Sequence, residues 1–227
     1  MVIGTLNESP LHSALKDYYF TKNAEREFPV GKYIVDIYSN GIIYEIQTGS
    51  FSGLSKKLST LLNENLVVLV YPIAACSLIA KHDNLDNDQK VAFRKSPKKG
   101  VFLDVLNELV YIPKLLNNPK FSIEIILIEE RVNRIYDAKV RRGRGGWRTI
   151  NRELTKIIDI KRIYSMQDIL DLISLDLPDS FDTKHLSIAM GEKTLSLAQK
   201  LAYCLREANM IKIKGKNGKS NVYKKIN

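Results

Sequence analysis

The chain contains 227 residues, of which 44% are hydrophobic and 26% are charged, and its formal net charge is +10. This length and composition are typical of a globular protein with a substantial core, in one large domain or two modest ones. The sequence has no apolar run near the roughly 18 residues of a membrane span and no secretion signal at its N-terminus. Its two cysteines, Cys76 and Cys204, have no ligand-like spacing. We therefore expect a cytoplasmic protein without a disulfide framework or a zinc site.

The basic residues gather in two zones. Residues 131–164 contain 11 Lys and Arg against 3 Asp and Glu, and residues 181–227 contain 10 against 3. Two basic zones on a chain whose remainder is mildly acidic indicate a polyanionic partner such as a nucleic acid. Solvated basic faces without a partner are the alternative.

The first predicted elements are a helix and a β-hairpin. Residues 10–24 carry apolar side chains at helical spacing, and a short extended stretch follows at 28–30. Two apolar segments, 33–38 and 42–47, then flank the pair Asn40-Gly41. Asn-Gly favours a two-residue type I′ turn, because both turn residues need a positive φ. With this turn, residues whose numbers sum to 81 face each other across the hairpin.

Asp36 and Glu45 are such a pair, and Gln47 lies on the same face two residues beyond Glu45. Like charges that face each other about 4.5–5.5 Å apart destabilise a sheet. Burial of an unpaired carboxylate between apolar neighbours is also unfavourable. The pair therefore indicates a site for a divalent cation, and Mg²⁺ or Mn²⁺ suits hard carboxylate oxygens. A hairpin face open to solvent, with both acids hydrated, is the alternative interpretation.

An alternation of helix and strand follows the hairpin. Apolar residues at helical spacing over 51–62 precede the fully apolar run 66–71, which is typical of a buried strand and predicts a parallel, right-handed crossover. The polar segment 79–99 is expected to be an exposed loop or ribbon. Further along, the pattern predicts a helix at 101–116, a strand at 123–128 and a glycine-rich loop at 141–148.

The C-terminal part has a different pattern. Three helices are predicted at 166–175, 182–190 and 193–209, and a hairpin with a basic, glycine-containing tip follows at 211–226. Three helices and a terminal hairpin are the elements of a winged helix-turn-helix domain.

The acids and the C-terminal pattern together resemble a known group of enzymes. Glu27, Asp36, Glu45 and Gln47 resemble the active-site motif of PD-(D/E)xK nucleases, in which an upstream Glu precedes a strand-borne Asp and a Glu-x-Lys on the next strand. The whole chain is also similar to a group of bacterial proteins that share these positions: Asp36, 45–51, Lys57-Leu58, 71–73, 95–98 and 197–203. The resemblance implies an α/β fold, with a restriction endonuclease-like core at residues 1–160 and a winged helix at 165–227.

The resemblance also implies roles for single residues. Asp36 and Glu45 would hold Mg²⁺ or Mn²⁺, and Glu27, or less favourably its neighbour Glu25, would support them. Gln47 stands where the motif has a lysine. An amide can orient water or donate to phosphate, but it carries no charge. Three explanations stay open: Gln47 is a functional variant, Lys57 or Lys56 of the following helix supplies the missing charge, or the site is degenerate and only binds metal or DNA. The scattered histidines, His12 among them, are expected on the surface or in helix packing.

Candidate contacts to DNA come from both basic zones. Those of the glycine-rich segment are Arg141, Arg142, Arg144, Trp147 and Arg148, and those of the winged helix are Lys193, Gln199, Lys200, Lys214, Lys216 and Lys219. Lysine and arginine contacts to phosphates give salt-dependent affinity and little choice of sequence. A winged helix that contacts protein, and a connector without a partner, are the alternatives.

The expected function is therefore a metal-dependent DNA endonuclease that acts on duplex or branched DNA. A catalytically inactive, nuclease-like regulator or adaptor that binds DNA is the competing hypothesis. RNA is not excluded as a partner, because phosphate contacts do not read the sugar. Cleavage of both strands would favour a homodimer, and no membrane partner is expected.

Overall fold

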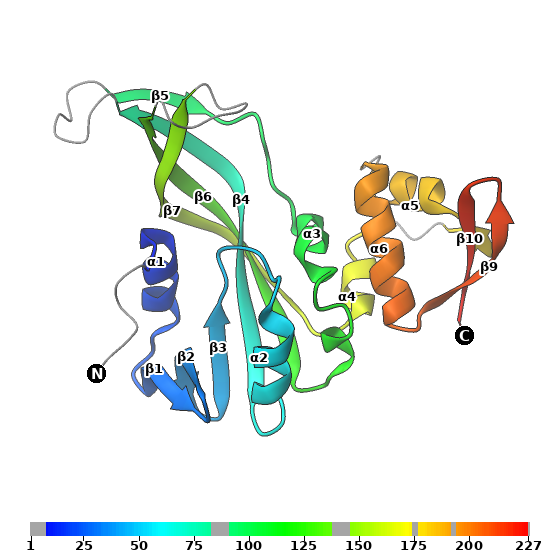
Figure 1. Ribbon diagram of the computed structural model, residues 1–227, viewed down its shortest axis with the longest axis horizontal. Coiled ribbons are helices and arrows are strands. Elements are labelled where there is room, and N and C mark those ends of the chain that lie inside the picture. Colours follow the sequence, from blue (N-terminus) through cyan, green and yellow to red (C-terminus); the bar gives the residue numbers. More distant parts are fainter. Residues whose placement is uncertain (1–7, 83–90, 138–145, 174–176, 192–193, 227) are drawn as a thin grey trace. The chain divides into compact units, whose positions relative to one another are not determined.

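The computed structural model describes residues 8–82, 91–137, 146–173, 177–191 and 194–226 (Figure 1). The chain begins with a helix, three strands and a second helix: α1 (Pro10–Tyr19), β1 (Ala24–Val30), β2 (Tyr33–Ser39), β3 (Ile42–Ile46) and α2 (Leu54–Leu61). Then follow β4 (Leu66–His82), β5 (Val91–Lys95), η1 (Phe102–Val105), α3 (Leu106–Leu109), η2 (Leu115–Asn117), β6 (Phe121–Tyr136) and β7 (Trp147–Ile163). The last elements are α4 (Met166–Leu170), β8 (Ser180–Phe181), α5 (Thr183–Ala189), α6 (Leu195–Glu207), β9 (Ile211–Asn217) and β10 (Ser220–Lys225).

A seven-stranded sheet contains the first seven strands, in the order β1-β2-β3-β4-β6-β7, and β5 pairs with β4. The strands β1, β2 and β3 form an antiparallel meander. The next strand, β4, runs in the same direction as β3 (Figure 1), and the N–H of Gln47 donates to the carbonyl of Val70 at 2.9 Å. Adjacent strands that run in the same direction must be joined by a crossover connection. The segment between β3 and β4, which contains α2, is therefore the predicted parallel crossover.

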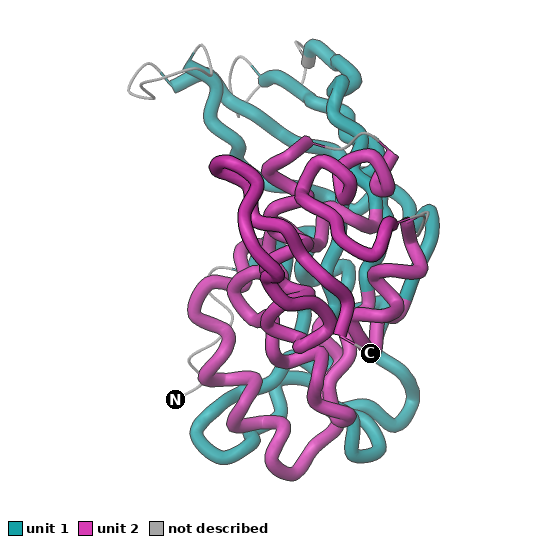
Figure 2. Tube along the Cα trace, turned by 90° about the vertical axis from the view of Figure 1, so that its right-hand side faces the viewer, with its two compact units in different colours: residues 1–48, 70–101, 125–161 teal, residues 49–69, 102–124, 162–227 magenta. Residues whose placement is uncertain are grey.

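The chain divides into two compact units (Figure 2). Unit 1 consists of residues 1–48, 70–101 and 125–161, and unit 2 of 49–69, 102–124 and 162–227. In unit 1, Leu11 and Leu15 of α1 and Val35 and Ile37 of β2 are fully buried. Because leucines four residues apart lie on one face of a helix, α1 is held to the sheet by a single apolar stripe.

Unit 2 has its own core and contains a second, three-stranded sheet in the order β8-β10-β9. The fully buried side chains of Phe51, Phe121 and Phe181 belong to this unit. Contacts between α3 and α6 include a hydrogen bond of 2.7 Å from Lys200 Nζ to Asn107 Oδ1. The C-terminal segment thus packs against residues 102–124 within unit 2, and not only against itself.

Several predicted elements have other bounds in the structure. The helix expected at 101–116 is three short helical pieces, because Pro113 cannot donate the backbone hydrogen bond that a continuous helix needs. The first helix ends at Tyr19, where Phe20 is already extended (φ −76°, ψ 102°), and β1 begins at Ala24 after a turn at Lys22 and Asn23. The polar segment 79–99 forms the end of β4 and all of β5, so the ribbon interpretation is correct for its described residues.

The long strand β7 was not predicted, and β4 and β6 extend well beyond their apolar runs. Many side chains of β7 are half-buried or exposed, in an irregular pattern. Because neither face of this strand is buried throughout, its sequence lacks the alternation that identifies a strand. No helix among the described residues has the length and apolar character of a membrane span.

Candidate functional site

The hairpin between β2 and β3 has the turn that its sequence predicts. Asn40 and Gly41 have φ values of 51° and 80°. The ladder pairs Ile37 with Tyr44, Tyr38 with Ile43 and Ser39 with Ile42, so the predicted register is confirmed for these pairs. The ladder ends there, one position before Asp36 and Glu45. The numbers of the paired residues sum to 81, and so do those of Asp36 and Glu45, so these two acids take corresponding positions on β2 and β3.

A third acid takes the corresponding position on β1. Residues 24–26 pair with 37–39, and residues 28–30 pair with 33–35, so the ladder skips the position of Glu27 and Asp36. We call Glu27, Asp36 and Glu45 the acid row, because they take corresponding positions on three adjacent strands. Regular pairing of both ladders is lost at this row.

The backbone of Glu27 is strained. Its φ is +51°, in the left-handed region that a residue with a Cβ atom seldom adopts. This conformation costs roughly 1–2 kcal/mol, and such strain is commonly found at binding and catalytic sites. Glu25 lies two residues before Glu27 and pairs with Tyr38. Of the two acids, Glu27 is the one that takes part in the acid row.

Each carboxylate oxygen of Asp36 has a partner, one in an ion pair and the other in a hydrogen bond. His12 Nε2 lies 3.2 Å from Oδ1, and the N–H of Ile46 donates to Oδ2 at 2.8 Å. Burial by itself would raise the pKa of Asp36, but the hydrogen bond and the charge of His12, together with the Ile46 N–H, lower it below the ordinary value. The carboxylate therefore stays ionised at neutral pH and is available as a ligand for a cation.

His12 itself is polarised by the same contact. Burial would lower its pKa, but the hydrogen bond and charge of Asp36, and the charge of Glu8, raise it above the ordinary value. The sequence predicts a surface or packing role for His12, whereas the structure assigns it a defined partner in the acid row.

Lys16 lies one turn further along α1 and joins the acids. Its Nζ forms an ion pair with Glu27, lies 3.2 Å from Glu8 and is 3.9 Å from Asp36. Burial would lower its pKa, but the hydrogen bonds to Glu27 and Glu8 raise it, so the ammonium is charged at neutral pH. His12 and Lys16 were missed as site residues. Their spacing of four residues, which directs both to one face of a helix, is the signal that could have identified them.

The other predicted site residues have different surroundings. Glu45 is buried in β3, and Gln47 follows directly after that strand. Lys57 and Lys56 belong to α2, in unit 2. The structure thus brings Glu27 and Asp36 together around one cation, while the prediction that Asp36 and Glu45 share a metal ion stays a prediction.

Glu27 and Asp36 supply the hard oxygen donors that a divalent metal ion requires. One ammonium nitrogen contacts both Glu27 and Asp36, so a single cation can be shared by the two acids. Mg²⁺ needs only one or two carboxylates and retains several waters. Among the described residues, no three His, Cys, Asp or Glu side chains are grouped closely enough to form a complete metal site. The remaining ligands would therefore be waters or substrate oxygens.

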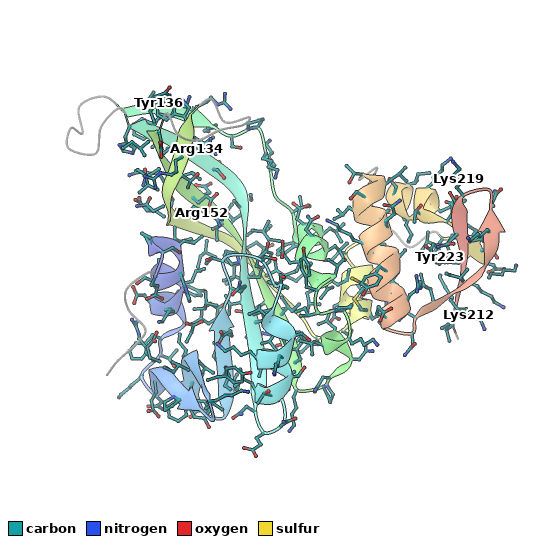
Figure 3. All side chains as sticks on the ribbon, viewed as in Figure 1. Arg134, Tyr136, Arg152, Lys212, Lys219 and Tyr223 are labelled. Atoms are coloured by element: carbon teal, nitrogen blue, oxygen red, sulfur yellow. The ribbon has the colours of Figure 1, made fainter. Side chains whose placement is uncertain are left out.

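The glycine-rich segment lies largely outside the described residues, and with it Arg141, Arg142 and Arg144. Trp147, at the start of β7, packs edge to face against Tyr136, and Lys81 Nζ lies 4.4 Å from the centre of its ring. Arg148 forms an ion pair of 3.4 Å with Asp137. Trp147 and Arg148 thus have structural partners at the end of the β6–β7 ribbon, where Figure 3 shows Tyr136 and Arg134.

The helix α6 presents a narrow polar face to solvent. Ser196, Gln199, Tyr203 and Arg206 are exposed on this face, while Leu197, Ala198, Leu201 and Ala202 are buried. Lys200 is committed to Asn107, and Lys193 lies outside the described residues. Of the predicted helix contacts, Gln199 is therefore the one that points to solvent.

The hairpin of β9 and β10, which we call the wing, is strongly basic. Residues 211–226 contain six lysines and no acid, and all six lysines are exposed: Lys212, Lys214, Lys216, Lys219, Lys224 and Lys225. Figure 3 shows Lys219 near the tip and Lys212 near the base, with Tyr223 between them. Lys214 also lies 3.1 Å from Ser180 Oγ on β8. This surface has the charge that phosphate contacts require.

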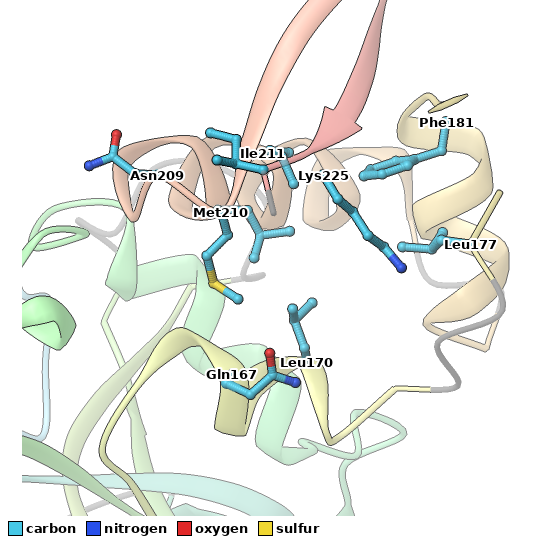
Figure 4. Close-up of a pocket in the computed structure, with 10 residues that line it drawn as sticks. Gln167, Leu170, Leu177, Phe181, Asn209, Met210, Ile211 and Lys225 are labelled. Carbon is cyan, nitrogen blue, oxygen red and sulfur yellow. The ribbon is translucent and has the colours of Figure 1, made fainter. Parts of the chain in front are cut away.

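A cavity of about 280 Å³ lies beside the wing in unit 2 (Figure 4). Its walls come from α4, α6, β9 and neighbouring segments, and they are mainly apolar, with Leu170, Phe181 and Met210 among them. Lys225 is the one charged residue in the lining, and no acid accompanies it. The cavity has no acid–base pair for catalysis.

Comparison with known proteins identifies relatives of the chain. Residues 9–164 match the model of a domain of unknown function, DUF8091. An uncharacterized protein of Treponema pallidum (strain Nichols) is 30% identical over 182 residues, which are 80% of this chain and 72% of the relative. No solved structure matches. The family match begins at Ser9, the N-cap of α1, and ends at Tyr164, directly after β7, so it contains the whole acid row. The chain therefore belongs to the DUF8091 family.

Proposed function

We propose that this protein is a metal-dependent DNA endonuclease whose C-terminal segment is a winged helix that binds the DNA. The observation that carries the proposal is the acid row, in which Glu27 and Asp36 share one cation and Glu27 adopts a strained backbone. A left-handed backbone at a residue with a Cβ atom is strained, and such strain is commonly found at binding and catalytic sites.

The order of the elements supports the proposal. The sequence α1-β1-β2-β3-α2-β4, with β3 between β2 and β4 in the sheet, is the order expected for a restriction endonuclease-like core. The later order α4-β8-α5-α6-β9-β10, with its sheet order β8-β10-β9, is the order expected for a winged helix, with α6 as its recognition helix. A likeness of fold is only an analogy for function, so the site residues must supply the chemistry.

Each residue of the site has a role in phosphodiester hydrolysis. Asp36 and Glu27 would hold Mg²⁺ or Mn²⁺, which would polarise a phosphoryl oxygen and lower the pKa of a bound water. Glu45, on the neighbouring strand, would add a third carboxylate to the row. The amide of Gln47 would orient the attacking water or donate to a phosphate oxygen. Ile46 fixes Asp36 through its N–H, so the ligand oxygens keep their direction while substrate binds.

The test is cleavage of plasmid and of labelled duplex, single-stranded and branched DNA, and of RNA, with Mg²⁺ and with Mn²⁺. Asp36→Asn should lower the cleavage rate by at least about a hundredfold, because the ligand charge is lost, with DNA affinity within about twofold of the unaltered protein. Asp159→Asn is the matched control, since Asp159 is an exposed acid of β7. Equal cleavage by the Asp36→Asn and Asp159→Asn proteins would reject the assignment.

A second candidate function is a DNA-binding regulator with an inactive nuclease core. The observation in its favour is that Glu27 and Asp36 already contact cationic partners in Lys16 and His12, while Gln47 lacks the charge of the motif's lysine. Such a protein would bind DNA with strong salt dependence and would cleave none of these substrates with either metal ion. The same panel of substrates therefore separates the two functions.

A further inference from the structure

Among the described residues, Lys16 is the one lysine or arginine that is buried, with 5% of its surface exposed. Lysine is seldom buried to this extent unless its charge is paired. Its side chain reaches from α1 to β1, where Nζ forms an ion pair with Glu27. The ammonium can therefore be enclosed only if groups of opposite charge lie close to it.

Three carboxylates surround the ammonium, and they come from three segments of the chain. Glu27 of β1 pairs with it directly, Glu8 before α1 lies 3.2 Å away, and Asp36 of β2 lies 3.9 Å away. One positive charge thus faces three negative ones. The three carboxylates around Lys16 Nζ therefore retain an excess of negative charge, which attracts a cation of higher charge than an ammonium.

His12 contributes to the same arrangement from the preceding turn of α1. Its Nε2 and the Nζ of Lys16 both approach Oδ1 of Asp36, at 3.2 Å and 3.9 Å. The other oxygen, Oδ2, is held by the Ile46 N–H. The oxygen of Asp36 that is open to exchange of its cation is therefore Oδ1, on the side of α1.

We propose that the ammonium of Lys16 is the resident counter-ion of the acid row, and that a divalent cation binds between Glu27 and Asp36 by displacing it. This inference rests on the proposed function, since both require a metal ion at this place. It adds that the metal-free protein carries its own cation there, and that the affinity for the metal is set by competition with Lys16.

The test is the affinity for Mn²⁺ alone, measured by calorimetry or by the loss of the free-ion signal in electron paramagnetic resonance. Lys16→Met removes the competing charge and should raise the Mn²⁺ affinity about tenfold or more. Lys22→Met is the matched control, because it removes the same charge from an exposed position just after α1. A lysine with only a structural role would leave the affinity unchanged or lower it when replaced.

A second measurement uses the unaltered protein, so it does not depend on the folding of a variant. Amine labelling followed by mass spectrometry should find Lys16 protected without metal, and Mn²⁺ should increase its labelling several-fold. Lys22 should react equally in both conditions.

The outcomes distinguish this inference from the function on which it rests. If the unaltered protein binds Mn²⁺, Lys16→Met binds it no more tightly and Lys16 stays protected, displacement is wrong and the metal site survives. If neither protein binds Mn²⁺, the metal site is absent, and both the inference and the proposed nuclease are overturned.

Discussion

The acid row and the wing are both clusters of charged residues, but their charges are stabilised in different ways. At the acid row, Asp36 and Lys16 are largely enclosed and each contacts partners of opposite charge. The wing has six exposed lysines and no acid in residues 211–226. Water stabilises the lysines, whereas enclosed charges need partners fixed at short distance. We therefore expect the acid row to determine chemistry and the wing to determine affinity.

The largest effect should come from the wing. Replacing Lys212, Lys214, Lys216 and Lys219 together by Gln should weaken duplex binding roughly tenfold to a hundredfold near physiological salt, and lower the slope of log affinity against log salt by up to about 4. Fluorescence anisotropy over a salt series measures both. The Asp36→Asn protein should keep the full slope, and a reduced slope in that protein would break the division between the two regions.

The next effect concerns α5, the helix that precedes α6 in the chain. Asp182 caps α5, and its Oδ1 accepts hydrogen bonds from the N–H groups of Lys184 at 2.9 Å and His185 at 3.1 Å. Asp182→Ala should cost roughly 1 kcal/mol of unfolding free energy, measured by urea denaturation. Asp179→Ala, a nearby exposed acid, should have almost no effect, and equal losses in both proteins would contradict the capping role.

Backbone strain at Glu27 predicts that a glycine at this position is more stable than an alanine, the reverse of the usual order. Because φ is +51° there, Glu27→Gly should be about 1 kcal/mol more stable than Glu27→Ala. Both variants lose the carboxylate, so the difference between their urea midpoints isolates the backbone. Both should also lose Mn²⁺ affinity. Equal stability of the two variants would show that the left-handed conformation carries no strain.

The smallest effect is the pH dependence of the His12–Asp36 pair. The pKa of Asp36 is lowered on folding, so its contribution is present above its unfolded value of about 3.9 and is lost as pH falls through the folded value. The pKa of His12 is raised, so its contribution is present below about 6.5 and is lost as pH rises through the folded value. The pair should therefore stabilise the protein most between about pH 4 and pH 6.5.

Thermal melting of the unaltered protein and of His12→Asn over this range measures that contribution. The difference between the two melting temperatures should be largest inside the window and should shrink on either side. His82→Asn is the control, because a ring nitrogen of His82 lies 3.2 Å from the amide oxygen of Asn133. A difference that does not vary with pH would mean that His12 stabilises the fold by packing alone.

Local patterns predicted the elements whose signals lie close together in the chain. Asn40-Gly41 fixed the hairpin register, and the apolar run from Leu66 identified a buried strand. The helical spacing that begins at Leu195 and the strands around Gly218 were also recognised. The strand β7 was not, because neither of its faces is buried throughout and no alternation appears, and β6 was recognised only at 123–128.

The site could be predicted only in part. Asp36 and Glu45 stood out because acids between apolar strand residues are unusual, whereas Glu27 came from the resemblance to the nuclease motif. His12 and Lys16 did not, because α1 and β2 are separated in the sequence and local patterns do not predict that these two side chains approach Asp36. Nor could the sequence reveal that Lys16 Nζ reaches Glu27 and Asp36 together, since that depends on how α1 packs on the sheet.

The sequence by itself thus determined the hairpin register, the charge of the wing and the identity of the acids, because each of these follows from neighbouring residues and from turn geometry. The tertiary structure alone decided which cation the acids share, the left-handed backbone of Glu27 and the packing of α6 against α3. These features arise from burial, which brings segments that are distant in the sequence together.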